Sequence, residues 1–314
     1  MSTLRVYALG SHRVQRGEDL VDFPTQKAYD LTYLLLLHAG QPLERDWIAE
    51  RLWPMRPAGR ARRCLSTALW RLRRALGVGG SETGDELVQV ERDTLMIRVG
   101  DSRCWFDVAA FEGEVALGVQ GPLPCTPDRE AALRRALDLY RGDLLAGRYD
   151  DWCLAERERL RLMLLRVLKR LQRHSRLAED FEAAIAHGER LLRLDSLQED
   201  VHREMMRCYA DSGRPTRALA HFREWREELR SELGVEPMNE TWELYHRIRA
   251  ERRTYSPGLD APAPLASLES ALVEFDRALI ALCSAQEALQ AAALECGLTG
   301  REIRGFSVGR NNLD

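Results

Sequence analysis

The sequence lacks the features that would place it in a membrane or on a secretory route. No apolar run approaches the roughly 18 residues that span a bilayer, since even the four leucines at 34–37 are followed at once by His38. The N-terminus shows neither the extended apolar segment nor the cleavage site of a signal peptide. We therefore expect a globular, cytoplasmic protein with no membrane partner.

Recognisable metal and catalytic motifs are missing as well. The seven cysteines are scattered without a CxxC pair or paired histidines, which argues against a zinc site and a disulfide framework. The sequence contains no GxxxxGK[ST], GxSxG or HExxH motif and no acid/base pair in a glycine-rich context. We predict that the protein is not an enzyme and holds no cofactor and no metal.

Lysine is nearly absent, because only Lys27 and Lys169 contribute to the 46 basic residues. With 49 acidic residues the net charge is -3, so overall charge gives no indication of a nucleic-acid partner. The distribution along the chain does. Residues 56–74 contain seven arginines and no acidic residue, an imbalance that the composition of the whole chain does not explain.

The first hundred residues follow a recognisable order of elements. Alternating apolar residues and glycine turns predict two or three short strands over 4–23, and residues 87–90 and 95–98 flank a four-residue turn as in a hairpin. Between them, 3.6-residue spacing predicts three helices, over 25–39, 43–52 and 60–76. This order is typical of a winged helix-turn-helix, which we expect to occupy residues 1–111.

The chain after residue 111 is predicted to be helical. Helical spacing extends over six segments, 128–146, 151–175, 178–193, 198–212, 215–233 and 239–253. The tetrapeptide AIAH at 184–187 recurs as ALAH at 218–221, a shift of 34 residues that matches the tetratricopeptide (TPR) unit. We expect a TPR-like all-α domain over 112–253, and hence a mainly α protein with small β elements.

A last helix is predicted beyond a linker at 254–264. Its apolar residues, from Leu265 to Leu289, are spaced three and four apart, and the helical pattern continues to residue 297. Two interpretations are equally supported for this C-terminal segment, 265–314. The helix at 265–297 either joins two copies as a homodimer or packs on the repeat domain of its own chain.

The arginine-rich helix carries the functional hypothesis. If the leucines at 65, 69, 72 and 76 face the core, its other face resembles one that a recognition helix presents to the major groove of double-stranded DNA. Arginine can pair with guanine, while serine, threonine and tryptophan can contact phosphate, base edges or sugar. The candidate residues are Arg62, Arg63, Ser66, Thr67, Trp70, Arg71 and Arg74. The hairpin tip adds Arg92 and Thr94, although Glu91 and Asp93 weaken that contact.

Several motifs resemble those of the antibiotic-regulatory-protein type transcriptional activators of Streptomyces. The DNA-binding part is matched by IAERLWP at 48–54, ALWRLRRALG at 68–77 and FDV at 106–108 with Phe111. Their bacterial transcriptional activator domain is matched by YDDW at 149–152, ERERL at 156–160 and ELGVEP at 232–237. The resemblance covers about residues 4–250.

This resemblance implies an OmpR-like winged helix, binding to direct repeats near a promoter, and activation through contact with RNA polymerase. One departure concerns the wing, where Thr94–Ile97 replaces the GYRL-like strand common in the family. A helical-repeat adaptor that binds proteins without specific DNA recognition is the alternative hypothesis. It predicts that no DNA complex forms at low salt.

Overall fold

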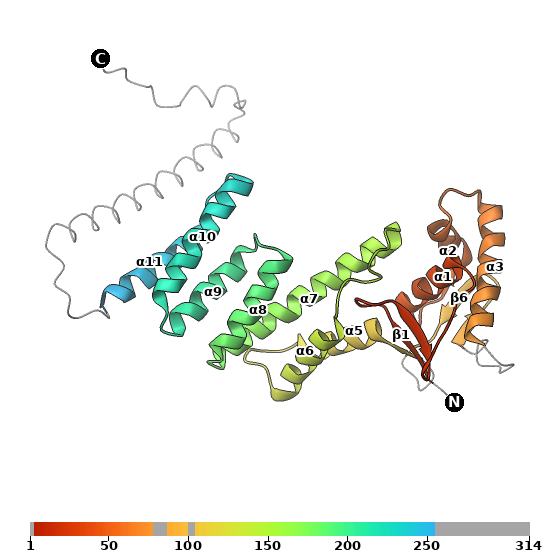
Figure 1. Ribbon diagram of the computed structural model, residues 1–314, viewed down its shortest axis with the longest axis horizontal. Coiled ribbons are helices and arrows are strands. Elements are labelled where there is room, and N and C mark those ends of the chain that lie inside the picture. Colours follow the sequence, from red (N-terminus) through yellow and green to blue (C-terminus); the bar gives the residue numbers. More distant parts are fainter. Residues whose placement is uncertain (1–2, 78–86, 100–103, 255–314) are drawn as a thin grey trace, which may run out of the picture. The chain divides into compact units, whose positions relative to one another are not determined.

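The computed structural model describes residues 3–77, 87–99 and 104–254. The first third of the chain contains both strands and helices, and helices alone follow in the described part after it (Figure 1). Within the described part, no helix is both long and apolar enough to cross a bilayer. The helix predicted at 265–297, with the linker before it from residue 255, lies outside the described residues.

Two small sheets accompany the first three helices. Strands β1 (Leu4–Tyr7), β2 (Arg13–Arg16), β3 (Asp19–Leu20) and β7 (Cys104–Phe106) pair in the order β3-β2-β1-β7. Only β7 runs parallel to its neighbour β1. Strands β4 (Leu43–Glu44), β5 (Val88–Val90) and β6 (Thr94–Ile97) pair in the order β4-β6-β5. The strands expected over 4–23 and the expected hairpin are confirmed.

The three predicted helices are also confirmed, as α1 (Gln26–Leu37), α2 (Arg45–Leu52) and α3 (Ala58–Leu76). Helix α1 starts at the hydroxyl of Thr25, which accepts the backbone N–H of Ala28, and it is buried along most of its length. The first two residues expected in the second helix instead form β4, because they pair with β6. A two-residue strand carries too little alternation to be seen in the sequence.

Helix α5 (Asp107–Gly118) begins directly after β7 and packs on α6 (Pro127–Leu139). The prediction of one helix over 128–146 is wrong at its C-terminal end. Leu145 has a φ of 46°, and Leu144 forms a bridge with Leu9 next to β1. Helical geometry is incompatible with both features, so the chain leaves α6 and contacts the N-terminal sheet before α7 (Asp151–Leu177) starts.

The remaining helices form antiparallel hairpins. Helices α8 (Phe181–Leu194), α9 (Glu199–Asp211), α10 (Pro215–Leu233) and α11 (Asn239–Thr254) follow at close to the predicted positions. Helix α8 packs on α7 and α9, and α10 packs on α9. Ala184 and Ala218, which occupy equivalent positions in the sequence repeat, are both fully buried. The repeat therefore corresponds to equivalent packing positions in α8 and α10.

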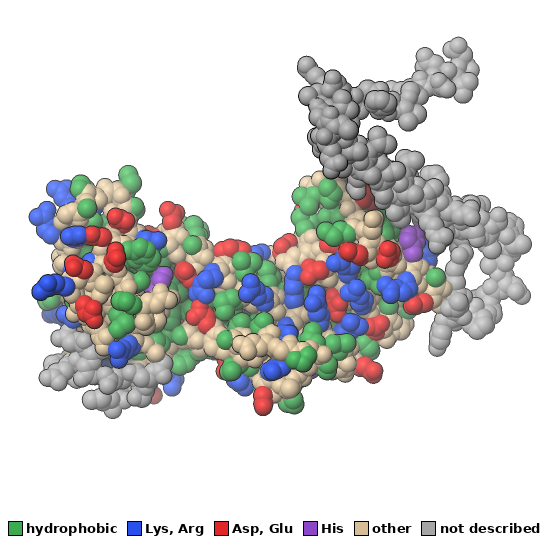
Figure 2. All heavy atoms as spheres, turned by 180° about the vertical axis from the view of Figure 1, so that it is seen from behind, with side chains coloured by type: hydrophobic (Ala, Val, Ile, Leu, Met, Phe, Trp, Pro, Cys, Tyr) green, Lys and Arg blue, Asp and Glu red, His purple; other side chains and the backbone are tan. Residues whose placement is uncertain are grey.

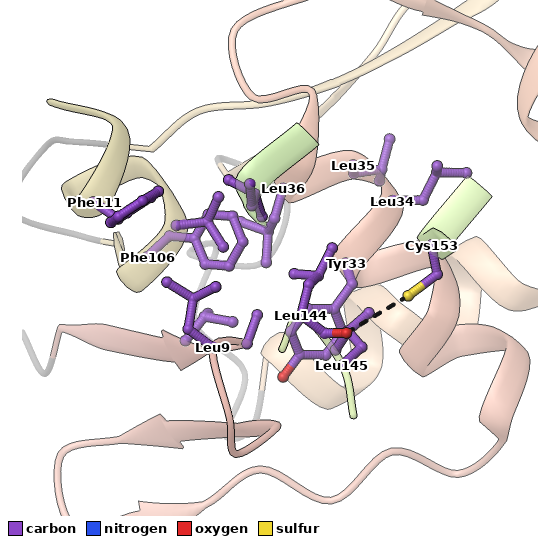
Figure 3. Packing of buried hydrophobic residues seen from close by; sticks show 14 of the residues in the cluster. Leu9, Tyr33, Leu34, Leu35, Leu36, Phe106, Phe111, Leu144, Leu145 and Cys153 are labelled. Atoms are coloured by element: carbon purple, nitrogen blue, oxygen red, sulfur yellow. Dashed lines mark hydrogen bonds between the residues drawn. The ribbon is translucent and has the colours of Figure 1, made fainter. Parts of the chain in front are cut away.

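A continuous hydrophobic core links the N-terminal elements to the first helices that follow them. It extends from Leu4 in β1 to Val201 in α9, while a second cluster occupies α8 to α11. Figure 3 shows part of the first cluster, where Leu9, Tyr33 and Phe106 lie with Leu144 and neighbouring residues. The domain boundary predicted at residue 111 falls inside α5.

Candidate nucleic-acid interface

Helix α3 has one buried and one exposed face, as the leucine spacing predicts. Its core side consists of Ala61, Leu65, Ala68, Leu69, Leu72, Ala75 and Leu76, all buried. These residues pack on α1 and α2. Burial along nearly the full length of the helix holds its orientation, so the outward face is presented on a rigid support.

The exposed face carries the predicted site residues. Six of them are exposed and Arg71 is half-buried; the exposed ones are Arg62, Arg63, Ser66, Thr67, Trp70 and Arg74. Trp70 is 58% exposed, an unusual position for so large an apolar side chain. The guanidinium of Arg74 lies 5.4 Å from the centre of its ring. In Figure 2, Lys and Arg side chains gather along the edge of the molecule where this helix lies.

One edge of this face is neutralised by helix α2. Arg62 forms a bidentate ion pair with Asp46, which lowers the pKa of that carboxyl. Arg45, the residue before Asp46, donates to the hydroxyl of Ser66 at 3.0 Å. Sequence reasoning missed Arg45 and Asp46, because the acid-free window that identified α3 begins ten residues later. Arg62 and Ser66 are thus partly engaged within the protein.

Residues in the middle of the exposed face make fewer contacts with charged groups of the protein. Thr67 donates its hydroxyl hydrogen to the carbonyl oxygen of Arg63 at 3.1 Å, which leaves its lone pairs as acceptors. Within the described part of the chain, Arg63 and Arg71 have no ion-pair partner. Their charges are therefore available to an external anion, and the planar guanidinium can bind phosphate or carboxylate through two hydrogen bonds.

The two residues predicted at the wing differ in their exposure and in the element to which they belong. Arg92 is exposed in the bend between β5 and β6, whereas Thr94 belongs to β6, is half-buried and lies 3.5 Å from a carboxylate oxygen of Glu91. The backbone N–H of Arg45 donates to the carbonyl oxygen of Asp93 at 2.9 Å, which ties the tip of the hairpin to the start of α2. The wing places one cation, Arg92, between two acids.

Comparison with known proteins finds a matching domain family and several related regulatory proteins. Residues 106–249 match the family described as Bacterial transcriptional activator domain. The regulatory protein DnrI of Streptomyces peucetius is 30% identical over 248 residues, which cover 74% of this chain and 85% of DnrI. The regulatory protein AfsR of Streptomyces griseus is 29% identical over 270 residues, but the matched part spans only 26% of its length.

A solved structure supports the fold. Mycobacterium tuberculosis EmbR, determined in complex with a low-affinity phosphopeptide, superimposes with a TM-score of 0.64 over 88% of this chain and 71% of EmbR, at 20% sequence identity. The likeness confirms a mainly helical chain in which a winged helix-turn-helix precedes TPR-like helical hairpins.

Proposed function

Because the chain belongs to the family of antibiotic-regulatory-protein type transcriptional activators and is a transcription regulator, we propose that it binds specific double-stranded DNA through the exposed face of α3. The observation that carries the proposal is the rigidly supported face with Arg63 and Arg71 unpaired within the described residues. Placed in the major groove, arginine side chains contact guanine or phosphate. Arg62, Ser66, Thr67, Trp70 and Arg74 complete the surface, and Arg92 and Thr94 contribute from the wing.

The experiment starts from a duplex selected by the protein from a random pool. Arg74→Ala and Arg71→Ala should each weaken binding to that duplex about tenfold, since one good arginine contact contributes roughly 1–3 kcal/mol. Arg173→Ala, which removes an exposed arginine on α7, serves as the matched control and should bind like the wild type. Thermal melting of all three variants should match the wild type. Unchanged binding by both α3 variants contradicts the proposal, and absence of any DNA complex at low salt favours the adaptor hypothesis.

We further propose that operators contain direct repeats near a promoter and that the bound protein activates transcription by contacting RNA polymerase. Family membership supports both statements. The selected duplexes should then contain one motif twice in the same orientation, at a spacing close to a multiple of the helical turn. Transcription in vitro with purified polymerase should rise when the protein is added, and Arg71→Ala should need about tenfold more protein for the same rise. A single or inverted motif contradicts the direct-repeat arrangement.

The division into a DNA-binding domain at 1–111 and an activator domain at 112–253 is part of this proposal, as is a homodimer formed through 265–297. Light scattering on the full chain and on a chain ending at Arg253 tests the dimer. A dimeric full chain and a monomeric shortened chain support the homodimer. An unchanged oligomeric state in the shortened chain rules it out.

A further inference from the structure

An open depression of about 480 Å³ lies between the start of α1 and the exposed face of α3. Four of its lining residues are cations, Lys27, Arg60, Arg63 and Arg71, and none is acidic. In the described part of the chain, the three arginines have no ion-pair partner. A concave surface lined by one sign of charge attracts an anion more strongly than the same charges spread on a convex surface.

Lys27 differs from the three arginines because it already has partners. Its ammonium lies 3.3 Å from Asp30 and 3.8 Å from Asp150, which is the residue before α7. Asp30 is only 1% exposed and also pairs with Arg148. Asp150 is more open, with 33% of its side chain exposed, and its other cation, Arg148, is 3.9 Å away.

These contacts connect two regions of the chain. Lys27 belongs to the DNA-binding part, whereas Arg148 and Asp150 lie in the segment that matches the activator family. If Lys27 turned away, Asp30 would keep its pair with Arg148, so no buried charge would be left uncompensated. The Lys27 side chain is 37% exposed and can therefore change partner at low cost.

We propose that this depression binds one phosphodiester group of the DNA backbone, held by Arg60 and Lys27, and that Asp150 competes with this phosphate for Lys27. The inference rests on the proposed function, because it assumes that α3 contacts DNA. The phosphate contact positions the duplex without reading its sequence. Asp150 makes the affinity depend on the activator part, because displacement of the start of α7 from α1 releases Lys27 for the phosphate.

The test is an anisotropy titration of the full chain with a selected duplex and an unrelated one, from 50 to 200 mM salt. Loss of one phosphate contact lowers the salt slope by about 0.9, so the double variant Arg60→Gln/Lys27→Gln should reduce the fourfold-salt change in Kd by about 3.5-fold, and each single variant should reduce it by less. Both single variants should weaken the two duplexes by the same factor. Asp150→Asn should tighten both.

A double variant separates competition from general charge repulsion. In the Lys27→Gln background, Asp150→Asn should have no further effect, because the residue for which Asp150 competes is gone. Asp151→Asn is the matched control: Asp151 is the exposed neighbouring acid, and in the described structure it forms no ion pair. It should bind like the wild type. Melting curves confirm that the variants fold. Asp150→Asn should leave the start of α7 intact, because the Asp150 side chain makes no hydrogen bond to the first turn of that helix.

The outcomes distinguish the two proposals. If Arg74→Ala weakens binding but Arg60→Gln and Lys27→Gln do not, the phosphate site is wrong and the role of α3 stands. If these variants and Arg71→Ala all leave binding unchanged, the proposed function itself fails. If Asp150→Asn tightens binding equally with and without Lys27, the effect is bulk electrostatics and the competition is refuted.

Discussion

A pair of histidines in the repeat region should make the protein lose stability as the pH falls from about 6.5. Atom Nε2 of His202 lies 2.7 Å from the carbonyl oxygen of Ser196, so this nitrogen carries a hydrogen and donates. Its Nδ1 lies 3.0 Å from Nε2 of His221 and must therefore accept. The two neutral rings thus form a chain of hydrogen bonds from His221 through His202 to the carbonyl of Ser196. The ring of His202 also stacks on Trp225.

Burial disfavours the charged form of both rings. It lowers the pKa of His202 and of His221 from 6.5 to about 4, and for His221 the neighbouring His202 lowers it further. Protonated His202 would direct its Nδ1–H toward the Nε2–H of His221, so the chain would break. Below pH 6.5 the unfolded chain binds these protons and the folded chain does not. The contribution of these two histidines to the free energy of unfolding is therefore fully present above pH 6.5, and it is lost as the pH falls toward 4.

The magnitude follows from proton linkage. One proton taken up only by the unfolded state costs about 1.4 kcal/mol of stability per pH unit. His221→Gln removes one titrating ring and keeps a donor nitrogen for Nδ1 of His202. Between pH 5.5 and 4.5 this variant should lose about 1 kcal/mol less unfolding free energy than the wild type.

Urea unfolding followed by circular dichroism at pH 7.5, 5.5 and 4.5 provides the measurement. Comparison with the wild type is needed because burial raises the pKa of Asp107 to about 6, which stabilises the fold as the pH falls and so opposes the histidines. Exposed His12 supplies the matched control, since its substitution leaves His202 and His221 unchanged. His12→Gln should show the same decline as the wild type. Equal declines for His221→Gln and the wild type would refute the reasoning.

Four further substitutions test the packing of the fold, each by its urea midpoint. Gly188→Ala should destabilise by about 1–3 kcal/mol, because the added carbon would lie 2.2 Å from the sulfur of Met205. Gly113→Ala, in the open middle of α5, should instead stabilise by up to about 1 kcal/mol. Asp107→Ala should cost about 1–3 kcal/mol, since the carboxylate accepts two buried backbone N–H groups that Ala would leave without a partner. Gly10→Ala should also destabilise, because its φ is +85° and backbone atoms lie 2.9 Å from the new carbon. A neutral result for Gly188→Ala or Gly10→Ala would contradict the close approach.

Local periodicity was sufficient to predict most helices and the orientation of α3. Leucines at 65, 69, 72 and 76 lie on one side of any helix of that register, so the exposed arginine face followed without tertiary information. The end of α6 could not be predicted in this way. It depends on Leu144 pairing with Leu9, a contact between residues more than a hundred positions apart.

The charge pairs at the interface escaped prediction for the same reason. The acid-free window correctly identified a basic helix, but it gave no sign that Asp46 would neutralise Arg62 from α2. Nor does the pattern around Lys27 indicate a contact with Asp150, which lies far along the chain. Composition along a helix shows which charges it carries, whereas tertiary structure decides which of them remain available to an external anion.

The structure ties the N-terminal part of the chain, which carries the candidate interface, to the segment that follows it. Asp107, at the start of α5, accepts the backbone N–H groups of Ala8 and Leu9 at the end of β1. Arg148 supplies the cation for Asp30, which is buried in α1. Helix α1 in turn packs on α3, so residues of the activator segment support the helix that carries the candidate interface. The activator segment therefore supports the fold of the helix that carries the candidate interface.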